Sequence, residues 1–76
     1  MSDVPITPEG LEAVRRELDE LTTRRRPSIV AKIKAARELG DLSENFEYHA
    51  AKNEQGLLER RITILRSRLQ HAQVID

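Results

Sequence analysis

Four carboxylates near the middle of the chain are the side chains whose type and spacing could do chemistry. They lie in the stretch ELGDLSENFE (residues 38–47), which contains no Lys or Arg. Asp41 and Glu44, three residues apart, could each give an oxygen to Mg²⁺, but that ion prefers six oxygen ligands and keeps several waters. The pair would therefore need another macromolecule to complete the shell. Alternatively, Asp41, Ser43 and Glu44 simply cap the helix that follows.

Two long helices are expected to position these acids, the first over about residues 8–39. Thr7 suits the N-cap, and Pro8 suits the first helical position. Apolar residues then recur at the three- and four-residue steps of a coiled-coil seam, namely Leu11, Val14, Leu18, Leu21, Ile29, Ile33 and Ala36. Steps of four on both sides of Arg25, together with Pro27, predict a bend in this helix near Pro27.

A second helix is expected over about residues 44–73, after a tip at about residues 40–44. Its seam is Tyr48, Ala51, Gln55, Leu58, Ile62, Leu65, Leu69 and Ala72. Gly40 lies where a helix commonly ends, and the tip-structural residues are Gly40, Leu42, Ser43, Asn45 and Tyr48. Asn45 is either a second cap or a ligand contact, and Tyr48 is more typical of a core position than of a contact.

The two seams match one another arithmetically. Facing residues, such as Ile33 with Ala51 and Val14 with Leu69, keep a nearly constant sum of residue numbers, as in an antiparallel hairpin. We therefore predict the all-α fold class, with residues 1–76 forming one long antiparallel coiled-coil helical hairpin. At about 1.5 Å per residue each arm would be about 45–50 Å long, with the acids at its tip.

The composition of the chain and the order of its charged residues limit the classes of function that it could have. The 76 residues include no Cys and two His, which excludes disulfide and thiolate-zinc scaffolds. No apolar run could span a membrane, and we expect a cytoplasmic monomer with no membrane partner. The 13 basic and 13 acidic side chains cancel but are segregated in blocks. The block of Arg24, Arg25 and Arg26, level with Arg60 and Arg61, would bind an extended polyanion or form local pairs such as Arg25 with Glu59.

Near the tip, Arg37 and Lys52 could guide a phosphate backbone toward the acids, or they could be ordinary surface charges. The seam arithmetic places Arg37 near Glu47, and Lys32 opposite Lys52. Phe46 is a large apolar residue beside the tip, where it would either cover the hairpin end or meet a partner.

The stretch GDLSENFEYHAAKNEQG, with RRPSIVAKI before it and AQVID at the end, resembles the amino-terminal domain of the bacterial Gre transcript-cleavage factors, most of all the GreA type. The resemblance covers essentially the whole chain, and the run through the tip is highly specific. Phe46 departs from the small residue, usually Ala, of the common motif. Gre factors continue into a globular carboxy-terminal domain, which we expect to be absent from this chain.

The resemblance implies a transcription elongation factor domain that enters the secondary channel of RNA polymerase. There it would stimulate the intrinsic cleavage of backtracked RNA and rescue arrested complexes. Asp41 and Glu44 would help to hold the second Mg²⁺, shared with the polymerase and not bound by the isolated domain. Arg37 and Lys52 would contact the 3′ end of the nascent RNA, and Arg24, Arg25 and Arg26 match a basic mid-shaft region. The domain would be an accessory factor and not itself an enzyme.

Two other classes of function stay open at this stage. One is a structural or dimerising coiled-coil hairpin, for which Arg25 on the seam and exposed seam ends would be suited. The other is a channel-binding inhibitor of polymerase without cleavage activity, against which the presence of both Asp41 and Glu44 argues.

Overall fold

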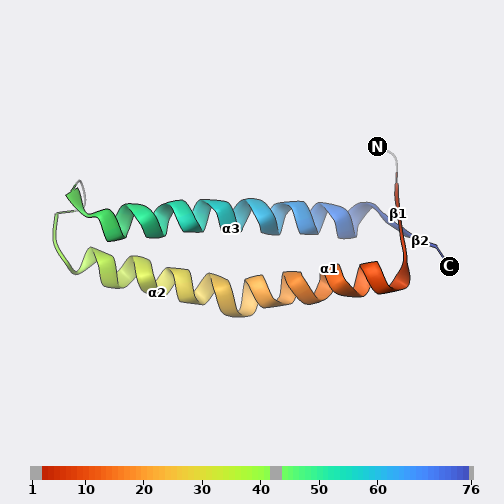
Figure 1. The fold of residues 1–76 in the computed structure, drawn as a ribbon, viewed down its shortest axis with the longest axis horizontal. Helices are drawn as coiled ribbons and strands as arrows, with labels where there is room; N and C mark the ends of the chain where they lie inside the picture. The colour runs from red at the N-terminus through yellow and green to blue at the C-terminus, as the bar shows by residue number, and fades with distance from the viewer. Residues whose placement is uncertain (1–2, 42–43, 76) are drawn as a thin grey trace.

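The computed structural model describes residues 3–41 and 44–75 and has an elongated, mostly helical shape, 54 × 23 × 12 Å. Figure 1 shows the chain running out along one helical arm and returning along a second arm beside it. The elements are β1 (Val4–Ile6), α1 (Pro8–Glu20), η1 (Leu21–Arg25), α2 (Arg26–Arg37), α3 (Phe46–His71) and β2 (Ala72–Val74). Within the described ranges, no helix combines the length and apolarity needed to cross a bilayer.

The first arm begins as the sequence predicts. Thr7 is the N-cap of α1, and its Oγ1 accepts a hydrogen bond from the backbone N–H of Gly10 at 3.0 Å. Pro8 follows in the first turn, where its missing N–H has no intrahelical partner to lose. The start of the arm is therefore fixed by local side-chain chemistry.

The irregularity expected near Pro27 is a π-helix, η1, which lies just before the proline. The N–H of Arg26 donates to the carbonyl of Leu21, five residues back, so one extra residue is accommodated in the turn. The hydroxyls of Thr22 and Thr23 donate to carbonyls of the preceding turn, at 2.9 Å to Leu18 and 2.7 Å to Asp19. The extra residue rotates the following part of the helix. Arg26 therefore faces α3, whereas the seam pattern had predicted Arg25 at that position.

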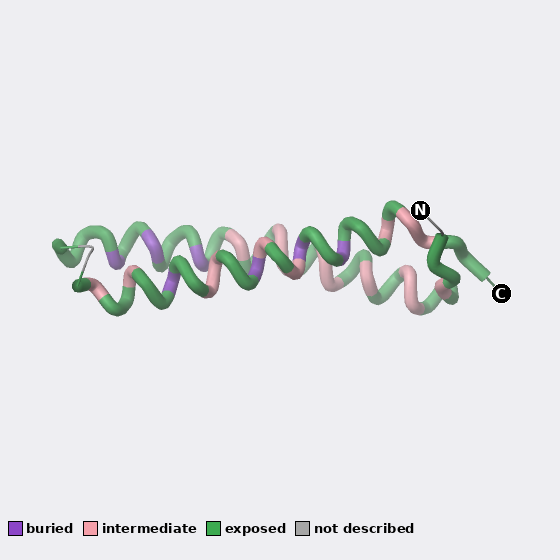
Figure 2. The backbone as a smooth tube through the Cα atoms, turned by 90° about the horizontal axis from the view of Figure 1, so that it is seen from above, coloured by how far each residue is buried: buried purple, intermediate pink, exposed green. Residues whose placement is uncertain are grey.

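The core lies between the arms and consists of predicted seam positions. Among the described residues, the buried side chains are Ile29, Ile33, Ala36, Ala51, Leu58, Ile62 and Leu65. Figure 2 shows them concentrated away from the end that carries the chain termini, and α1 and η1 contribute half-buried residues only. Leu18, Leu21 and Tyr48 pack against this core from the side. Burial is thus densest in the half of the hairpin nearer the tip.

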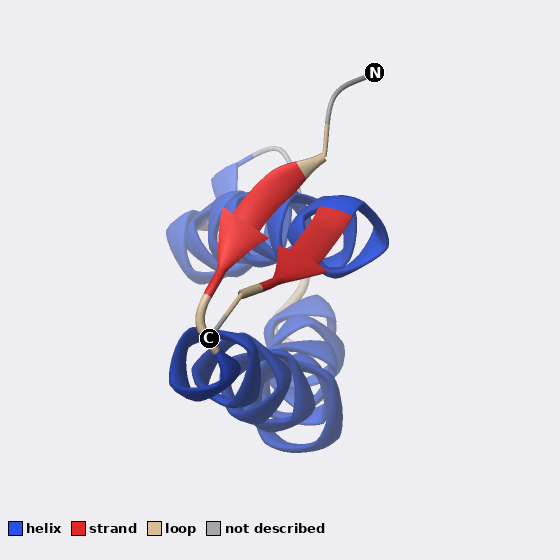
Figure 3. Ribbon diagram, turned by 90° about the vertical axis from the view of Figure 1, so that its right-hand side faces the viewer, coloured by secondary structure: helices blue, strands red, loops and turns tan. Residues whose placement is uncertain are grey.

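The all-α prediction is incomplete, because β1 and β2 form a short parallel sheet at the end of the arms remote from the tip. Val4 pairs with Ala72 and Ile6 with Val74. Figure 3 shows the two strands side by side across the arm ends. The predicted second helix therefore ends at His71 and not near residue 73, because the following residues adopt extended backbone and pair with β1.

The helix ends next to the tip also lie inside the predicted bounds. The first arm leaves the α-helix after Arg37 and not Leu39, because its last N–H groups, up to that of Gly40, bond to carbonyls three residues back. The second arm begins at Phe46 and not at residue 44, because Asn45 is its N-cap. Leu42 and Ser43, predicted as tip-structural residues, lie outside the described residues.

Candidate functional site

Both candidate metal ligands lie at the tip and both are exposed. Asp41 follows Gly40, whose φ of 116° lies in the region that side chains other than glycine rarely adopt. An added Cβ at Gly40 would meet nothing within 4 Å, so backbone conformation, and not space, favours glycine there. Glu44 comes just before the cap of α3. Their carboxylate oxygens are the ligands that Mg²⁺ prefers, and they would hold an ion only with further ligands supplied from outside the chain.

Asn45 joins the two arms at the tip. Its Oδ1 accepts a hydrogen bond from the N–H of Tyr48 at 2.9 Å, and its Nδ2 donates to the carbonyl of Ala36 at 2.6 Å. The first bond caps α3, and the second joins the start of α3 to the carbonyl of Ala36, which also accepts from the N–H of Leu39 at 3.1 Å. The cap of α3 is thus Asn45, and the alternative in which Asp41, Ser43 and Glu44 cap this helix is wrong for the two acids that the structure describes.

The two aromatic residues of the tip region differ in burial. Tyr48 is half-buried against the core, as predicted, and its ring meets that of His49 edge-on with centroids 5.7 Å apart. Phe46 is 88% exposed, so it does not cover the hairpin end.

The predicted RNA contacts Arg37 and Lys52 line the same groove between α2 and α3. This groove has a volume of about 430 Å³ and is lined by Val30, Ile33, Lys34, Arg37, Lys52 and Gln55. We call it the basic groove. Lys52 Nζ donates to Gln55 Oε1 at 3.0 Å inside it. Its lining has three cations and no acid, so it is suited to an anionic ligand.

The opposite side of the hairpin carries a second groove with different chemistry. It has a volume of about 340 Å³ and is lined by four alanines with Lys32, Glu47 and Glu54. Lys32 Nζ lies 3.4 Å from Glu54. Lys32 therefore pairs with Glu54, and the two pairs of residues that the seam arithmetic placed level with one another are divided between the grooves, Lys32 from Lys52 and Glu47 from Arg37.

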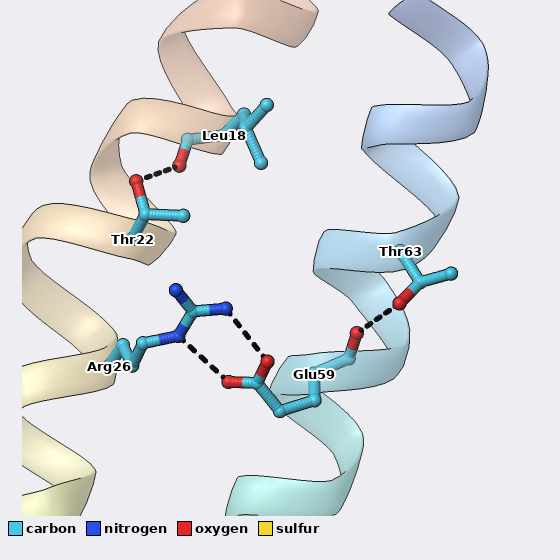
Figure 4. Close-up of polar contacts among 5 residues, drawn as sticks. All are labelled: Leu18, Thr22, Arg26, Glu59 and Thr63. Atoms are coloured by element: carbon cyan, nitrogen blue, oxygen red, sulfur yellow. Dashed lines mark hydrogen bonds and ion pairs between the residues drawn. The ribbon is translucent and has the colours of Figure 1, made fainter. Parts of the chain in front are cut away.

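The middle of the shaft is joined by two arginine–carboxylate pairs that each make two hydrogen bonds. Arg26 donates to Glu59 at 2.9 and 2.7 Å, as Figure 4 shows. Arg61 donates to Glu17 at 2.7 and 2.8 Å. These bonds lower the pKa of Glu17 and of Glu59, and partial desolvation offsets some of that effect. Paired donors of this kind fix the geometry more firmly than a single contact does.

Two further arginines of the predicted mid-shaft block also have acidic neighbours. Arg24 lies 3.6 Å from Glu20, and Arg25 lies 3.7 Å from Glu54. The expected pair of Arg25 with Glu59 is displaced by one residue, because η1 turns Arg26 toward α3. Arg60 is the one member of the block for which the described residues show no ion pair. Most of the block's charge is therefore compensated within the chain.

Sequence reasoning missed Lys34 as a member of the site. The spacing could have indicated it, because Lys34 and Arg37 are three residues apart and so lie on one helix face. It also missed Glu17 as the partner of Arg61. That pairing depends on the phase of α1 relative to α3, which η1 changes.

Comparison with known proteins identifies the family of this chain. Residues 4–74 match the family model described as "Transcription elongation factor, N-terminal", which covers GreA and GreB. The chain is 51% identical over 76 residues to transcription elongation factor GreA of Baumannia cicadellinicola, which is all of this chain and 48% of that protein. It is 53% identical over 73 residues to GreA of Francisella tularensis subsp. novicida, which is 96% of this chain and 46% of that protein.

The chain therefore belongs to the family of transcription elongation factor amino-terminal domains, and it is of the GreA type. It spans about half the length of the curated relatives that it matches.

Proposed function

We propose that this chain is the part of a transcription elongation factor that enters RNA polymerase and stimulates the polymerase's own cleavage of backtracked RNA, so that arrested complexes resume. The observation that carries the proposal is the exposure of Asp41 and Glu44 at one end of a hairpin 54 Å long and 12 Å across its thinnest dimension. A narrow rod with acids at its end is suited to deliver carboxylates through a channel. The family membership supports the same conclusion.

In this proposal the chain is an accessory factor, and the polymerase is the enzyme. Asp41 and Glu44 would hold a Mg²⁺ ion shared with carboxylates of the polymerase, because two carboxylates supply too few of the six ligands that the ion prefers. When bound, such an ion would lower the pKa of a coordinated water and stabilise negative charge on the phosphate oxygens. The chain's own contribution is to place two anionic oxygens and to fix the backbone around them, through Gly40 and Asn45.

The proposed partners are bacterial RNA polymerase and the 3′ end of the nascent RNA, in the cytoplasm, with the factor acting as a monomer. Arg37 and Lys52 would contact the RNA near the tip, since both line the basic groove. Contacts from Arg24, Arg25 and Arg26 would require their acidic neighbours to be exchanged for phosphates. We also propose that the two arms are an antiparallel coiled coil along their length. This is supported by the burial of seam residues on both arms.

One of the two observations that favoured a dimerising hairpin was Arg25 at a seam position, and Arg25 is exposed and lies beside Glu54. The other was the exposed ends of the seam. The alternative of an inhibitor without cleavage activity differs from the proposal only in what the tip acids do, so the acids decide between them.

The test is a transcript-cleavage assay on stalled polymerase with backtracked RNA. It compares the chain with its Asp41→Asn and Glu44→Gln variants, each alone and joined to the second half of the Francisella relative. We expect each substitution to reduce cleavage by at least about 10-fold, because losing an anionic ligand should cost no less than losing one of the groups that support a ligand. The melting temperature should change little, because Asn45 still caps α3. Full cleavage by both variants would contradict the metal-ligand role.

A further inference from the structure

Lys34 lies in the basic groove together with the two cations already considered as RNA contacts. Lys34 and Arg37 come from α2, and Lys52 comes from the facing wall on α3. Val30 and Ile33 supply an apolar floor. The groove therefore holds cations on both of its walls.

These three cations differ from most of the mid-shaft arginines in lacking an ion pair with the described part of the chain. No ion pair joins Lys34, Arg37 or Lys52 to a carboxylate of the described residues, whereas four of the five mid-shaft arginines lie within 4.0 Å of an acid. Lys32 provides the contrast on the same helix. It is two residues away, and it lies on the other groove at 3.4 Å from Glu54. Of these two lysines, Lys34 is the one whose charge is available to an external anion.

We propose that Lys34 is a third phosphate-binding residue of the basic groove, acting with Arg37 and Lys52 on one strand of RNA. The proposal rests on the proposed function, which supplies RNA as the polyanion. An RNA strand carries a negative charge at every nucleotide, so one extended ligand can meet cations on both walls. An acidic protein surface would have to bring several carboxylates together against their mutual repulsion to do the same.

The salt dependence of binding separates Lys34 from Lys32. The 76-residue chain is titrated into a fluorescein-labelled single-stranded oligoribonucleotide at a series of salt concentrations, and anisotropy gives the binding constant. The variants are Lys34→Gln and Lys32→Gln, which remove the same charge from the same helix on opposite grooves. Each phosphate contact to a single strand contributes about 0.7 to the slope of log K against log salt.

We expect Lys34→Gln to weaken binding at every salt concentration and to lower the slope by about 0.7, while Lys32→Gln leaves the slope unchanged. Circular dichroism melting of both variants checks that the fold is intact. Equal slopes for the two variants, an unchanged slope for Lys34→Gln, or no salt-dependent binding by the unaltered chain would each overturn the proposal.

The titration contains no polymerase and measures no cleavage. A failure of the cleavage assay with Asp41 and Glu44 intact would count against the proposed function and leave the slope comparison standing. A failure of the slope comparison would remove Lys34 from the site and leave the role of the acids standing.

Discussion

At the scale of single residues, the N-cap of α3 is Asn45. From the sequence, Asp41, Ser43 and Glu44 were the first candidates for capping this helix. One side chain uses its acceptor for the start of α3 and its donor for the end of α2. At the tip, the residue that holds the two arms together is therefore different from the two acids that are candidates for binding a metal ion. The residue that joins the two arms is an amide with no charge, and it is the N-cap of α3.

Substitutions of Asn45 should separate the contributions of its two hydrogen bonds to the stability of the fold. Asn45→Ala loses both, and we expect the free energy of unfolding to fall by about 2 kcal/mol, with about 1 for the cap and about 1 for the bond to Ala36. Asn45→Ser keeps a good capping oxygen and loses only the amide donor to Ala36, so it should cost about half as much. Urea unfolding followed by circular dichroism measures both variants. Equal losses would mean that the cap contributes nothing.

At the scale of elements, the arms are joined by apolar burial toward the tip and by ion pairs farther back. Ile29 and Ile33 of α2 are buried, whereas α1 has no buried residue and depends on contacts such as that of Glu17 with Arg61. The π-helix η1 lies at the change between the two regions and sets the phase that brings Arg26 to Glu59. Ion pairs that remain partly exposed are weakened by salt and by acid.

The two bidentate pairs should give the stability of the hairpin an acid-side dependence on pH. The hydrogen bonds from Arg61 and Arg26 lower the pKa of Glu17 and Glu59 in the folded chain. Their contribution is therefore fully present above the ordinary glutamate pKa of about 4.3 and is lost as the pH falls through the lower folded-state pKa. Thermal unfolding from neutral pH down to strongly acidic pH measures this loss.

The control for that experiment is the double variant Glu17→Gln with Glu59→Gln. It should be less stable than the unaltered chain at neutral pH and should lose less stability on acidification, because two of the titrating groups are gone. Parallel pH profiles for the two chains would show that these pairs do not contribute to stability.

At the scale of the whole molecule, the seam positions predicted from sequence include every side chain that is buried among the described residues. Periodicity fixes which helix face is apolar, so positions such as Ile62 and Leu65 could be predicted. The three-residue strands could not, since Val4–Ile6 and Ala72–Val74 are too short to show an alternating pattern and form only by meeting each other. The change of step predicted an irregularity near Pro27, but neither the π-helix at Leu21–Arg25 nor the rotation that its extra residue causes was predicted.

The candidate site was predictable to a similar extent. The acids and Gly40 follow from residue type and from their place between two seams. The separation of Lys32 and Lys34 onto different grooves depends on how α2 is rotated against α3. The sums of residue numbers predict how far along the rod a residue lies. Which of the two grooves its side chain lines could be learned only from the structure.

The Mg²⁺ dependence of transcript cleavage tests the central claim most directly. The rate at which polymerase cleaves backtracked RNA is measured over a Mg²⁺ titration, without the chain, with saturating chain, and with saturating Asp41→Asn or Glu44→Gln variant. If the tip acids share the ion, the chain should lower the Mg²⁺ concentration needed for half-maximal cleavage, and each substitution should return it toward the value for polymerase alone. A half-maximal Mg²⁺ concentration that is the same in all four reactions would contradict the account.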